Sequence, residues 1–447
     1  MVMDLRNGSG LGAFRFGPAV GVLVLLSGCM GGMEMPSLQR SHKDAAPSKA
    51  ARAGSFAPQE AVNSSLIANL QGRRSVLPAG GPYAQVADAV VAASSGAAEA
   101  ELRVARLKAE ARSKNWLPSI GPSVNLTSMS GLAASLLAES SVFDHGGKKA
   151  QREFASADVE VAAVGLAAGM NQRVFEGLSY YVNAERARAQ AAVSEKAATR
   201  LQGFETIMAE RVAGGISDRS EQQVISQKYA EMRATLSGDQ QAQDTAMVQL
   251  GAVAGRPLEG LHGLDDLPDV AANKSEPLSV VQARGEGARA LAQAQAEMAS
   301  LKPGISATAN VTEGNVNPGL RLNPGGLFNP GAGAQMEALR QTADVVARQN
   351  AEAAETANRR IVALDQQKAT LLSRQAQGAE VLRQTEGNLE LFTEQYKVGR
   401  RTLLELVGQY DSYARLERDQ TSLRFDIALI DLEIARDRGL LVEGARM

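Results

Sequence analysis

The sequence contains one structural unit twice, and this repeat constrains the fold more than any other feature of the chain. Pro118 is followed by alternating apolar and polar residues, and the same alternation follows Pro303, which lies 185 residues later (303 − 118). The V-F-D-H-G sequence around Phe143 returns, with the same separation, as L-F-N-P-G around Phe328. Landmarks in constant register indicate a tandem duplication, and so long a period indicates one large unit present twice rather than a solenoid.

A third landmark extends the duplication downstream. The sequence V-A-G-G ending at Gly215 corresponds to Y-K-V-G ending at Gly399, and Glu221 corresponds to Glu405. The separation here is 184 residues (399 − 215), so about one residue was lost in between. Each copy therefore reads as helix, strand, turn, strand, long helix, glycine turn and helix. We place the first copy at residues 83–270 and the second at residues 271–447.

Each copy contains a pair of strands with one apolar and one polar face. In the first copy, side chains alternate with a period of two between Trp116 and Phe143. In the second copy we expect strands over residues 304–312 and 319–328, the last of them weak because it contains N-P-G-G. A half-buried strand of a soluble sheet would alternate in the same way. The small, uncharged polar face nevertheless fits a water-filled lumen, and the aliphatic face fits lipid.

The segments around the strands predict unusually long helices. Residues 148–212 and 332–395 contain no proline, and the first of these helices would be about 95 Å long at ~1.5 Å per residue. Helices of this length are typical of a coiled coil or of the wall of a tunnel. Shorter helices are predicted over residues 84–115, 218–253, 279–299 and 402–441.

Composition and residue types argue against enzymes and nucleic-acid binding. Aromatic residues make up 4% of the chain and the net charge is −2, without a basic block for nucleic acid. The only histidines are His42, His145 and His262, and none has a spaced partner for metal or nucleophile chemistry. No glycine-rich phosphate-binding fingerprint is present. We therefore expect no enzymatic activity, no cofactor and no metal.

The N-terminus predicts export and a lipid anchor. Arg6 and Arg15 precede an apolar run from Ala19 to Leu26, which is too short to span a bilayer and is typical of a signal peptide. The sequence L-S-G-C that ends at Cys29 resembles a bacterial lipobox, which implies a signal peptide of residues 1–28 and acylation of Cys29. An ordinary signal peptide with an incidental cysteine is the alternative interpretation.

The residues after Cys29 predict which membrane holds the anchor and what kind of segment connects Cys29 to the folded part of the chain. Met30 follows the cysteine, where an aspartate would resemble an inner-membrane retention signal, so we expect the anchor in the outer membrane. Residues 29–82 are rich in Gly, Ala, Ser and Pro, and we expect them to form a flexible tether. Cys29 is the only cysteine, which excludes a disulfide within the chain.

Residues 84–441 resemble the TolC-like outer-membrane factors of Gram-negative bacteria. The resemblance is carried by the A-x-x-x-x-x-L-P segment ending at Pro118, by the two F-(D/N)-x-G closures, and above all by Y-K-V-G-R-R-T-L-L-E-L from Tyr396 to Leu406. It implies an α+β membrane protein, with a long α-helical coiled-coil barrel and four β-strands per chain in a shared, trimeric, twelve-stranded β-barrel. A barrel must be shared because four strands cannot close one alone in hydrocarbon.

The resemblance also implies a function and its partners. The chain would be the outer-membrane channel of a tripartite export system, and would act as a homotrimer in contact with outer-membrane lipid. Its partners would be a periplasmic adaptor and an inner-membrane transporter of RND or ABC type, in drug efflux or in type I secretion. The alternative is a lipid-anchored periplasmic coiled-coil scaffold of the same fold without pore activity, which the weak last strand favours.

Residues at the two glycine turns are assigned by the same resemblance. In the family, a tyrosine and an arginine of the second turn are linked to an acid of the first, and acidic rings line the closed mouth. The matching positions, which we take as candidate gate and adaptor contacts, are Gly215, Glu221, Tyr396, Gly399, Arg400, Arg401 and Glu405. Gly408 stands where a family member carries a second acid, so a second acidic ring is not expected. Solvated charge at helix ends is the alternative interpretation.

Overall fold

A computed structural model describes residues 64–128, 131–312, 315–326 and 330–446. These residues belong to one compact unit, Glu60–Met447. The predicted signal peptide and Cys29 lie outside the described residues, as do parts of the predicted turns between strands.

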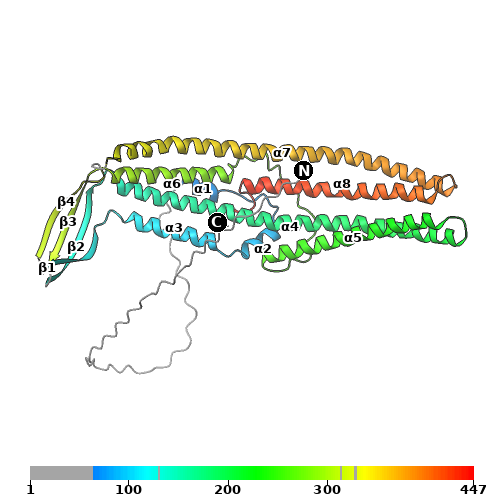
Figure 1. Ribbon diagram of the computed structural model, residues 1–447, viewed down its shortest axis with the longest axis horizontal. Coiled ribbons are helices and arrows are strands. Elements are labelled where there is room, and N and C mark those ends of the chain that lie inside the picture. The colour runs from blue at the N-terminus through cyan, green and yellow to red at the C-terminus, as the bar shows by residue number, and fades with distance from the viewer. Residues whose placement is uncertain (1–63, 129–130, 313–314, 327–329, 447) are drawn as a thin grey trace, which may run out of the picture. The chain divides into compact units, whose positions relative to one another are not determined.

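The order of helices and strands follows the predicted duplication (Figure 1). The first copy is preceded by the short helix α1 (Ser65–Gln71) and contains the following elements: α2 (Pro82–Ala92), α3 (Ala97–Ser113), β1 (Ser119–Ser128), β2 (Gly131–Phe143), α4 (Gly147–Ala213) and α5 (Arg219–Ala254). The second copy contains α6 (Leu278–Ser300), β3 (Gly304–Thr312), β4 (Asn315–Asn323), α7 (Ala332–Lys397) and α8 (Leu403–Asp437), and a 3₁₀ turn, η1 (Gly444–Arg446), comes after it.

The long helices α4 and α7 contain 67 and 66 residues, as the absence of interior proline predicts. They begin and end within about two residues of the predicted bounds, because glycine turns limit them. α4 ends at Gly214 and Gly215, and Gly215 has a φ of 72°. α7 is followed by Gly399, with a φ of 76°. Glycine adopts this left-handed conformation without steric cost, which ends the helix and lets the chain turn back.

One predicted helix is wrong. The segment 84–115 forms two helices, α2 and α3, separated at Ser94–Gly96, where Gly96 has a φ of 65°. The break separates two environments: α2 buries Tyr83, Val86 and Val90 against the middle of α4, whereas α3 is mostly exposed. A Cβ on Gly177 of α4 would lie 2.7 Å from Val90 Cγ2, so the missing side chain of Gly177 allows α2 to pack closely against α4.

The expected flexible tether does not extend to residue 82. Residues Ser65–Gln71 form α1, and Arg73 is buried against the end of the chain. The Arg73 guanidinium donates to the carbonyl oxygens of Arg438 at 2.6 Å and Glu276 at 2.9 Å. Arg438 in turn donates to the carbonyl of Ser275 at 3.0 Å. These bonds join the N-terminal segment, the joint between the copies and the C-terminal segment, a contact that composition cannot indicate.

The four strands form one antiparallel sheet in the order β1-β2-β3-β4, so that β2 and β3 join the two copies. The last predicted strand, 319–328, is misplaced: β4 runs from Asn315 to Asn323 and pairs with β3 along its whole length. Residues 324–326 leave the sheet, because Pro324 lacks an N–H group and Gly325 has a φ of 65°. Residues 327 and 328 lie outside the described residues.

The helices pack through two hydrophobic clusters. One lies where α1, α2, the middle of α4, the end of α5 and the end of α8 meet, and contains the edge-to-face pair Tyr83 and Tyr181 with ring centroids 6.1 Å apart. The second lies where the end of α4 and the start of α5 meet the end of α7 and the start of α8. Figure 1 shows α4 beside α5 and α7 beside α8, as the contacts require.

Candidate functional site

The strand register places apolar side chains of all four strands on one side of the sheet. Ile305, Ala307, Ala309 and Val311 of β3 pair directly with Leu322, Leu320, Pro318 and Val316 of β4. On the other edge of β3, Ala309 pairs with Ala138, which pairs with Ile120 of β1. Directly opposed residues point to the same face of an antiparallel sheet. We call the following set the apolar face: Ile120, Leu136, Ala138, Ile305, Ala307, Ala309, Val311, Val316, Pro318, Leu320 and Leu322.

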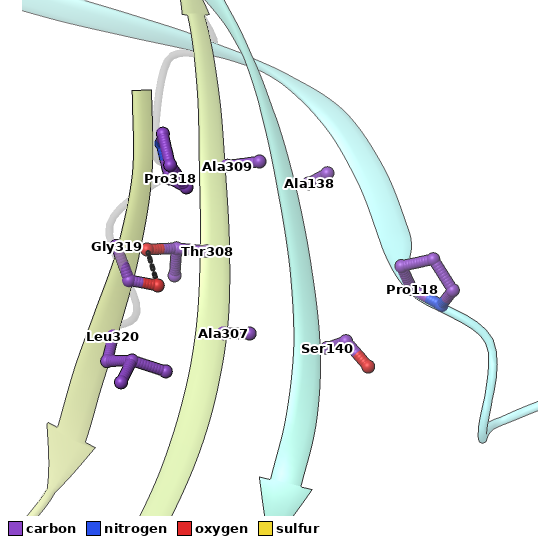
Figure 2. Close-up of a pocket in the computed structure, with 9 residues that line it drawn as sticks. All are labelled: Pro118, Ala138, Ser140, Ala307, Thr308, Ala309, Pro318, Gly319 and Leu320. Carbon is purple, nitrogen blue, oxygen red and sulfur yellow. Dashed lines mark hydrogen bonds between the residues drawn. The ribbon is translucent and has the colours of Figure 1, made fainter. Parts of the chain in front are cut away.

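The apolar face is open to its surroundings in the single chain. Leu320 is 78% exposed, and Ile120, Val316 and Leu322 are each more than half exposed. A shallow groove of about 600 Å³ runs over this face. Figure 2 shows its lining in two rows across three strands, Pro318–Ala309–Ala138 and Leu320–Ala307–Ser140. A contiguous exposed apolar surface of this kind marks contact with lipid or with another protein.

The opposite face of the sheet is polar. Thr308 Oγ1 donates to the Gly319 carbonyl at 3.3 Å, and Asn323 Nδ2 donates to Ser306 Oγ at 3.3 Å. Glu139 and Arg321 form an ion pair at 3.9 Å. The polar face therefore carries mostly uncharged groups, some of which bond to one another, and one ion pair.

Both edges of the sheet end without a partner strand. Within the described residues, β1 pairs only with β2 and β4 pairs only with β3. Each edge presents a row of backbone N–H and C=O groups that can bond to another strand. Among the described residues, both edge strands therefore have backbone groups that can pair with a further strand.

The first glycine turn is fixed by backbone bonds and by the N-cap of α5. After Gly215, the N–H of Ile216 donates to the Arg211 carbonyl at 2.8 Å. Asp218 caps α5 by accepting from the N–H groups of Ser220 and Glu221 at 2.9 and 3.1 Å. The Ser220 hydroxyl and these two N–H groups lower the pKa of the Asp218 carboxyl. Glu221 therefore lies in the first turn of α5, directly beside a negatively charged cap.

The second turn holds Arg401 by three contacts within its own copy. Arg401 Nε donates to Gln395 Oε1 at 3.0 Å, and its terminal nitrogen donates to Glu405 Oε1 at 2.9 Å. Its guanidinium carbon lies 4.6 Å from the centre of the Phe392 ring. Gly399 turns the chain so that the N–H of Arg400 donates to the Gln395 carbonyl at 2.8 Å.

Glu405 is both an ion-pair partner and a helix cap. It accepts from the Thr402 N–H at 2.9 Å, while its own N–H donates to Thr402 Oγ1 at 3.2 Å, so the two residues form a capping box. The Thr402 N–H, then the Arg401 guanidinium, lower the pKa of the Glu405 carboxyl. The carboxylate is therefore held charged at the start of α8.

The structure brings the two turns together but does not link their charges. Tyr396 packs against the second hydrophobic cluster, which includes Phe204 of α4, Ile225 of α5 and Tyr410 of α8. Among the described residues, Arg401 bonds within its own turn, and no hydrogen bond or ion pair joins it or Tyr396 to Glu221. In the single chain the predicted residues share one end of the helices without forming the expected bridge.

Ion pairs farther along the helices do connect the two copies, and sequence analysis missed them. Asp239 of α5 is 5% exposed; it accepts from Ser194 Oγ of α4 at 2.8 Å and from Arg418 Nε of α8 at 3.2 Å. Lys228 of α5 pairs with the buried Asp411 of α8 at 3.0 Å. These acids lie on the packed faces of their helices, at positions where apolar residues are usual.

A signal for Asp239 was present in the sequence. It occupies the third position of a seven-residue spacing whose other members, Ile225, Met232 and Ala246, are buried apolar residues. A charge at such a position must be paired, because desolvation of an unpaired charge is unfavourable. A charged residue on a long helix is usually solvated, so the residue type of Asp239 alone does not mark it as buried.

Two further features concern the described residues only. No helix among them carries an apolar stretch of the length and hydropathy needed to cross a bilayer. They contain no cluster of three or more His, Cys, Asp or Glu side chains with the geometry of a metal site.

A scan of the sequence against models of protein families found no match, and neither did a search of curated proteins. Solved structures do match. The outer membrane protein VceC from Vibrio cholerae has a TM-score of 0.71 at 17% identity, with 80% of this chain and 96% of VceC covered. The CmeC outer membrane channel of Campylobacter jejuni has a TM-score of 0.67 at 11% identity, with 81% and 86% covered.

The open state of the MtrE outer membrane channel of Neisseria gonorrhoeae has a TM-score of 0.62 at 16% identity, with 85% of this chain and 89% of MtrE covered. In each case the match extends over most of both chains. This chain has the fold of TolC-like outer-membrane channel proteins, as its resemblance to them predicted.

Proposed function

We propose that this chain is the outer-membrane channel of a tripartite export system. The observation that carries the proposal is the sheet: an exposed apolar face, an opposite polar face and two unpaired edges, joined to helices of 67 and 66 residues. Apolar-out and polar-in strands fit a membrane barrel with an aqueous lumen. Helices about 100 Å long, at ~1.5 Å per residue, fit a tunnel across the periplasm.

The unpaired edges favour a shared barrel. An open sheet edge is not tolerated in hydrocarbon, and a chain that contributes four strands needs other chains to close the barrel. Pairing β4 of one copy with β1 of the next satisfies both edges at once. We propose three copies and twelve strands, the number that the resemblance to TolC-like factors implies.

The exposure of α7 supports an assembly of several copies. α4 buries 24 of its residues within the chain, whereas α7, of almost equal length, buries only Ala332, Val346, Ala357 and Leu364. Its exposed apolar residues are distributed along the helix: Val345, Val362, Leu372, Val381 and Leu391. We propose that α7 packs against a neighbouring copy in the wall of the tunnel.

The two glycine turns are proposed as the periplasmic mouth, where the tunnel closes and where an adaptor docks. Glu221 and Gly215 belong to the first turn; Tyr396, Gly399, Arg400, Arg401 and Glu405 belong to the second. Three copies of Glu405 around one axis would create a negative field that favours cations. An adaptor would join this mouth to an inner-membrane transporter of RND or ABC type. Cys29 is proposed as the lipid anchor in the outer membrane, on the lipobox alone.

Single-channel conductance in planar bilayers tests the proposal, with wild-type protein beside Arg401→Ser. Small, cation-favouring currents that grow in the variant are expected if Arg401 restrains the mouth. Currents that the variant leaves unchanged would keep the channel and remove Arg401 from the gate. No insertion and no current from either protein, although both form heat-modifiable trimers in detergent, would overturn the proposed channel.

The alternative is a scaffold without pore activity, which a weak last strand would favour. The last strand was expected to be weak, but β4 pairs with β3 from Asn315 to Asn323. A scaffold would also leave the apolar face exposed to water, which is unfavourable for a surface of this extent.

A further inference from the structure

Three junctions between helices and strands meet beside the first row of the apolar face. They are α3–β1 around Trp116, β2–α4 around Phe143 to Lys149, and α6–β3 around Lys302. Aromatic and cationic side chains gather at these junctions, beside the acid Asp144, which accepts from the Lys148 N–H at 2.7 Å. We define the collar as Lys114, Trp116, Phe143, Lys148, Lys149 and Lys302.

Hydrogen bonds fix the collar to the fold. Asn115 Nδ2 donates to the Lys148 carbonyl at 3.0 Å, and Asn115 Oδ1 accepts from Arg152 at 2.7 Å, which holds the end of α3 against the first turns of α4. His145 Nε2 lies 3.0 Å from the Pro303 carbonyl oxygen, and its ring is 4.5 Å from the Phe143 ring. The junctions are therefore held at one level along the helices.

The collar side chains are available for contact. Trp116, the only tryptophan of the chain, is 65% exposed, and Phe143 is also exposed. Lys114 and Lys149 are engaged with acids of their own helices, at 3.0 and 3.6 Å. Within the described part of the chain, Lys148 and Lys302 form no ion pair.

Position and chemistry together identify a partner. Phe143 pairs with Ile305, in the row that begins the apolar face, so the collar lies where the apolar surface ends and the charged helices begin. Tryptophan and phenylalanine with lysine at such a boundary are typical of the headgroup level of a membrane. The apolar face extends about 20 Å from Ile305 to Val311, at ~3.3 Å per residue, comparable to the apolar band of a membrane barrel.

We propose that the collar binds phospholipid headgroups of the facing leaflet and prefers anionic ones. The proposal rests on the proposed membrane function and adds to it the depth of the chain and its lipid preference. Trp116 and Phe143 occupy the boundary between headgroups and acyl chains, while Lys148 and Lys302 contact lipid phosphates. Each free lysine near an anionic surface is worth about a fivefold change in affinity.

Tryptophan quenching in proteoliposomes tests the depth. Lipids brominated near the headgroup are expected to quench Trp116 more strongly than lipids brominated near the chain ends, and aqueous iodide is expected to quench it weakly. In a Trp116→Phe background, Leu320→Trp is expected to respond more to deep bromines. In the same background, Val248→Trp on α5, 73% exposed in the wild type, is expected to respond to iodide alone.

The lipid preference is tested by competition between brominated phosphatidylglycerol and unlabelled phosphatidylcholine, read from Trp116. We expect phosphatidylglycerol to be favoured by up to about 25-fold, about fivefold for each of the two free lysines, and less so at high salt. The Lys148→Gln/Lys302→Gln double variant should bring the ratio near one, whereas Lys196→Gln/Lys274→Gln should leave it unchanged.

The outcomes separate this proposal from the channel. Protein that fails to float with vesicles and gives no current would contradict the proposed function itself. Protein that inserts and conducts, but whose Trp116 is quenched by iodide and not by brominated lipid, would overturn the collar. A phosphatidylglycerol-to-phosphatidylcholine ratio near one at Trp116 of the wild type would overturn its anionic preference. Circular dichroism of each variant checks that the helices are intact.

Discussion

A charge on the apolar face should block membrane insertion, and a charge at the same depth on the polar face should not. Leu320 and Thr308 provide this comparison. Leu320 pairs with Ala307, and Thr308 is the next residue of β3 on the opposite face. The two positions therefore differ in depth by about one residue, or ~3.3 Å. Leu320→Lys and Thr308→Lys place the same side chain on the two faces.

The expected cost follows from the depth of Leu320. It lies one row beyond the Ile305–Leu322 row, about 7 Å into an apolar band of about 20 Å. A lysine facing lipid costs ~2–4 kcal/mol at the middle of the bilayer and ~0–1 kcal/mol near its surface, so about 2 kcal/mol applies here. Three copies in one barrel would lose about 6 kcal/mol, or roughly a factor of 10⁴ in the equilibrium for insertion.

Folding into phospholipid vesicles across a urea series measures this effect, with the heat-modifiable trimer on gels as the readout. Leu320→Lys should lower the urea midpoint markedly or prevent trimer formation. Thr308→Lys loses only a 3.3 Å bond to the Gly319 carbonyl and should remain within about 1 kcal/mol of wild type. Equal loss in the two variants, or greater loss in Thr308→Lys, would refute the assignment of the faces.

Three further predictions concern the helices. Arg418→Met leaves the Asp239 carboxylate buried without its cation and should lower the free energy of unfolding by about 3 kcal/mol. Adding Asp239→Asn should recover most of this loss in thermal melts. If the double variant shows no recovery, the result argues against a buried ion pair. Gly287→Leu should lower the free energy of unfolding by about 1–3 kcal/mol, because even a Cβ at this position would lie 2.6 Å from Val346 Cγ1. Adding Val346→Ala should relieve this steric clash. A Gly287→Leu variant as stable as wild type would show that α6 and α7 are not in close contact. Hydrogen bonds from the N-cap and a guanidinium lower the pKa of Glu405, so its contribution to stability is complete above its ordinary value of 4.5 and is lost as the pH falls through the lowered value. The protection factors of amides at the start of α8, taken relative to the intrinsic exchange rate at each pH, should therefore fall in acid for wild type but not for Glu405→Gln, and an identical pH profile would exclude this role.

Local patterns in the sequence predict most of the helices and strands. The period of two after Pro118 and Pro303 predicted β1 and β3, and β3 has the predicted bounds. The bounds of α4 and α7 followed from the glycines that flank them and from the absence of proline. The misplaced β4 shows the limit of local reasoning. Its residues 315–318 include Pro318, and proline disfavours a strand except at a sheet edge. The pairing with β3 shows that these residues do belong to the strand.

The candidate site was predictable in part. The motif from Tyr396 to Leu406 locates the second turn. The capping box has the spacing of threonine followed by glutamate three residues later, here Thr402 and Glu405. The partner of Arg401 was not predictable, since a guanidinium can reach any acid within a few ångströms. In the single chain it bonds to Gln395 and Glu405, which are four to six residues away, rather than to Glu221.

The order of residues along the chain is enough to identify each kind of segment: a duplicated set of strands and long helices, limited by glycine turns, with apolar and polar faces on the strands. Backbone conformation and face pattern depend on neighbours within a few residues, so they can be inferred from order alone. Which segments meet depends on packing and follows only from the folded chain. Folding joined β2 to β3, broke the first predicted helix at Gly96, attached Arg73 to the end of the chain and paired Asp239 with Arg418. These contacts join residues far apart in the sequence or result from such packing, and their free energy depends on burial that exists only after the chain has folded.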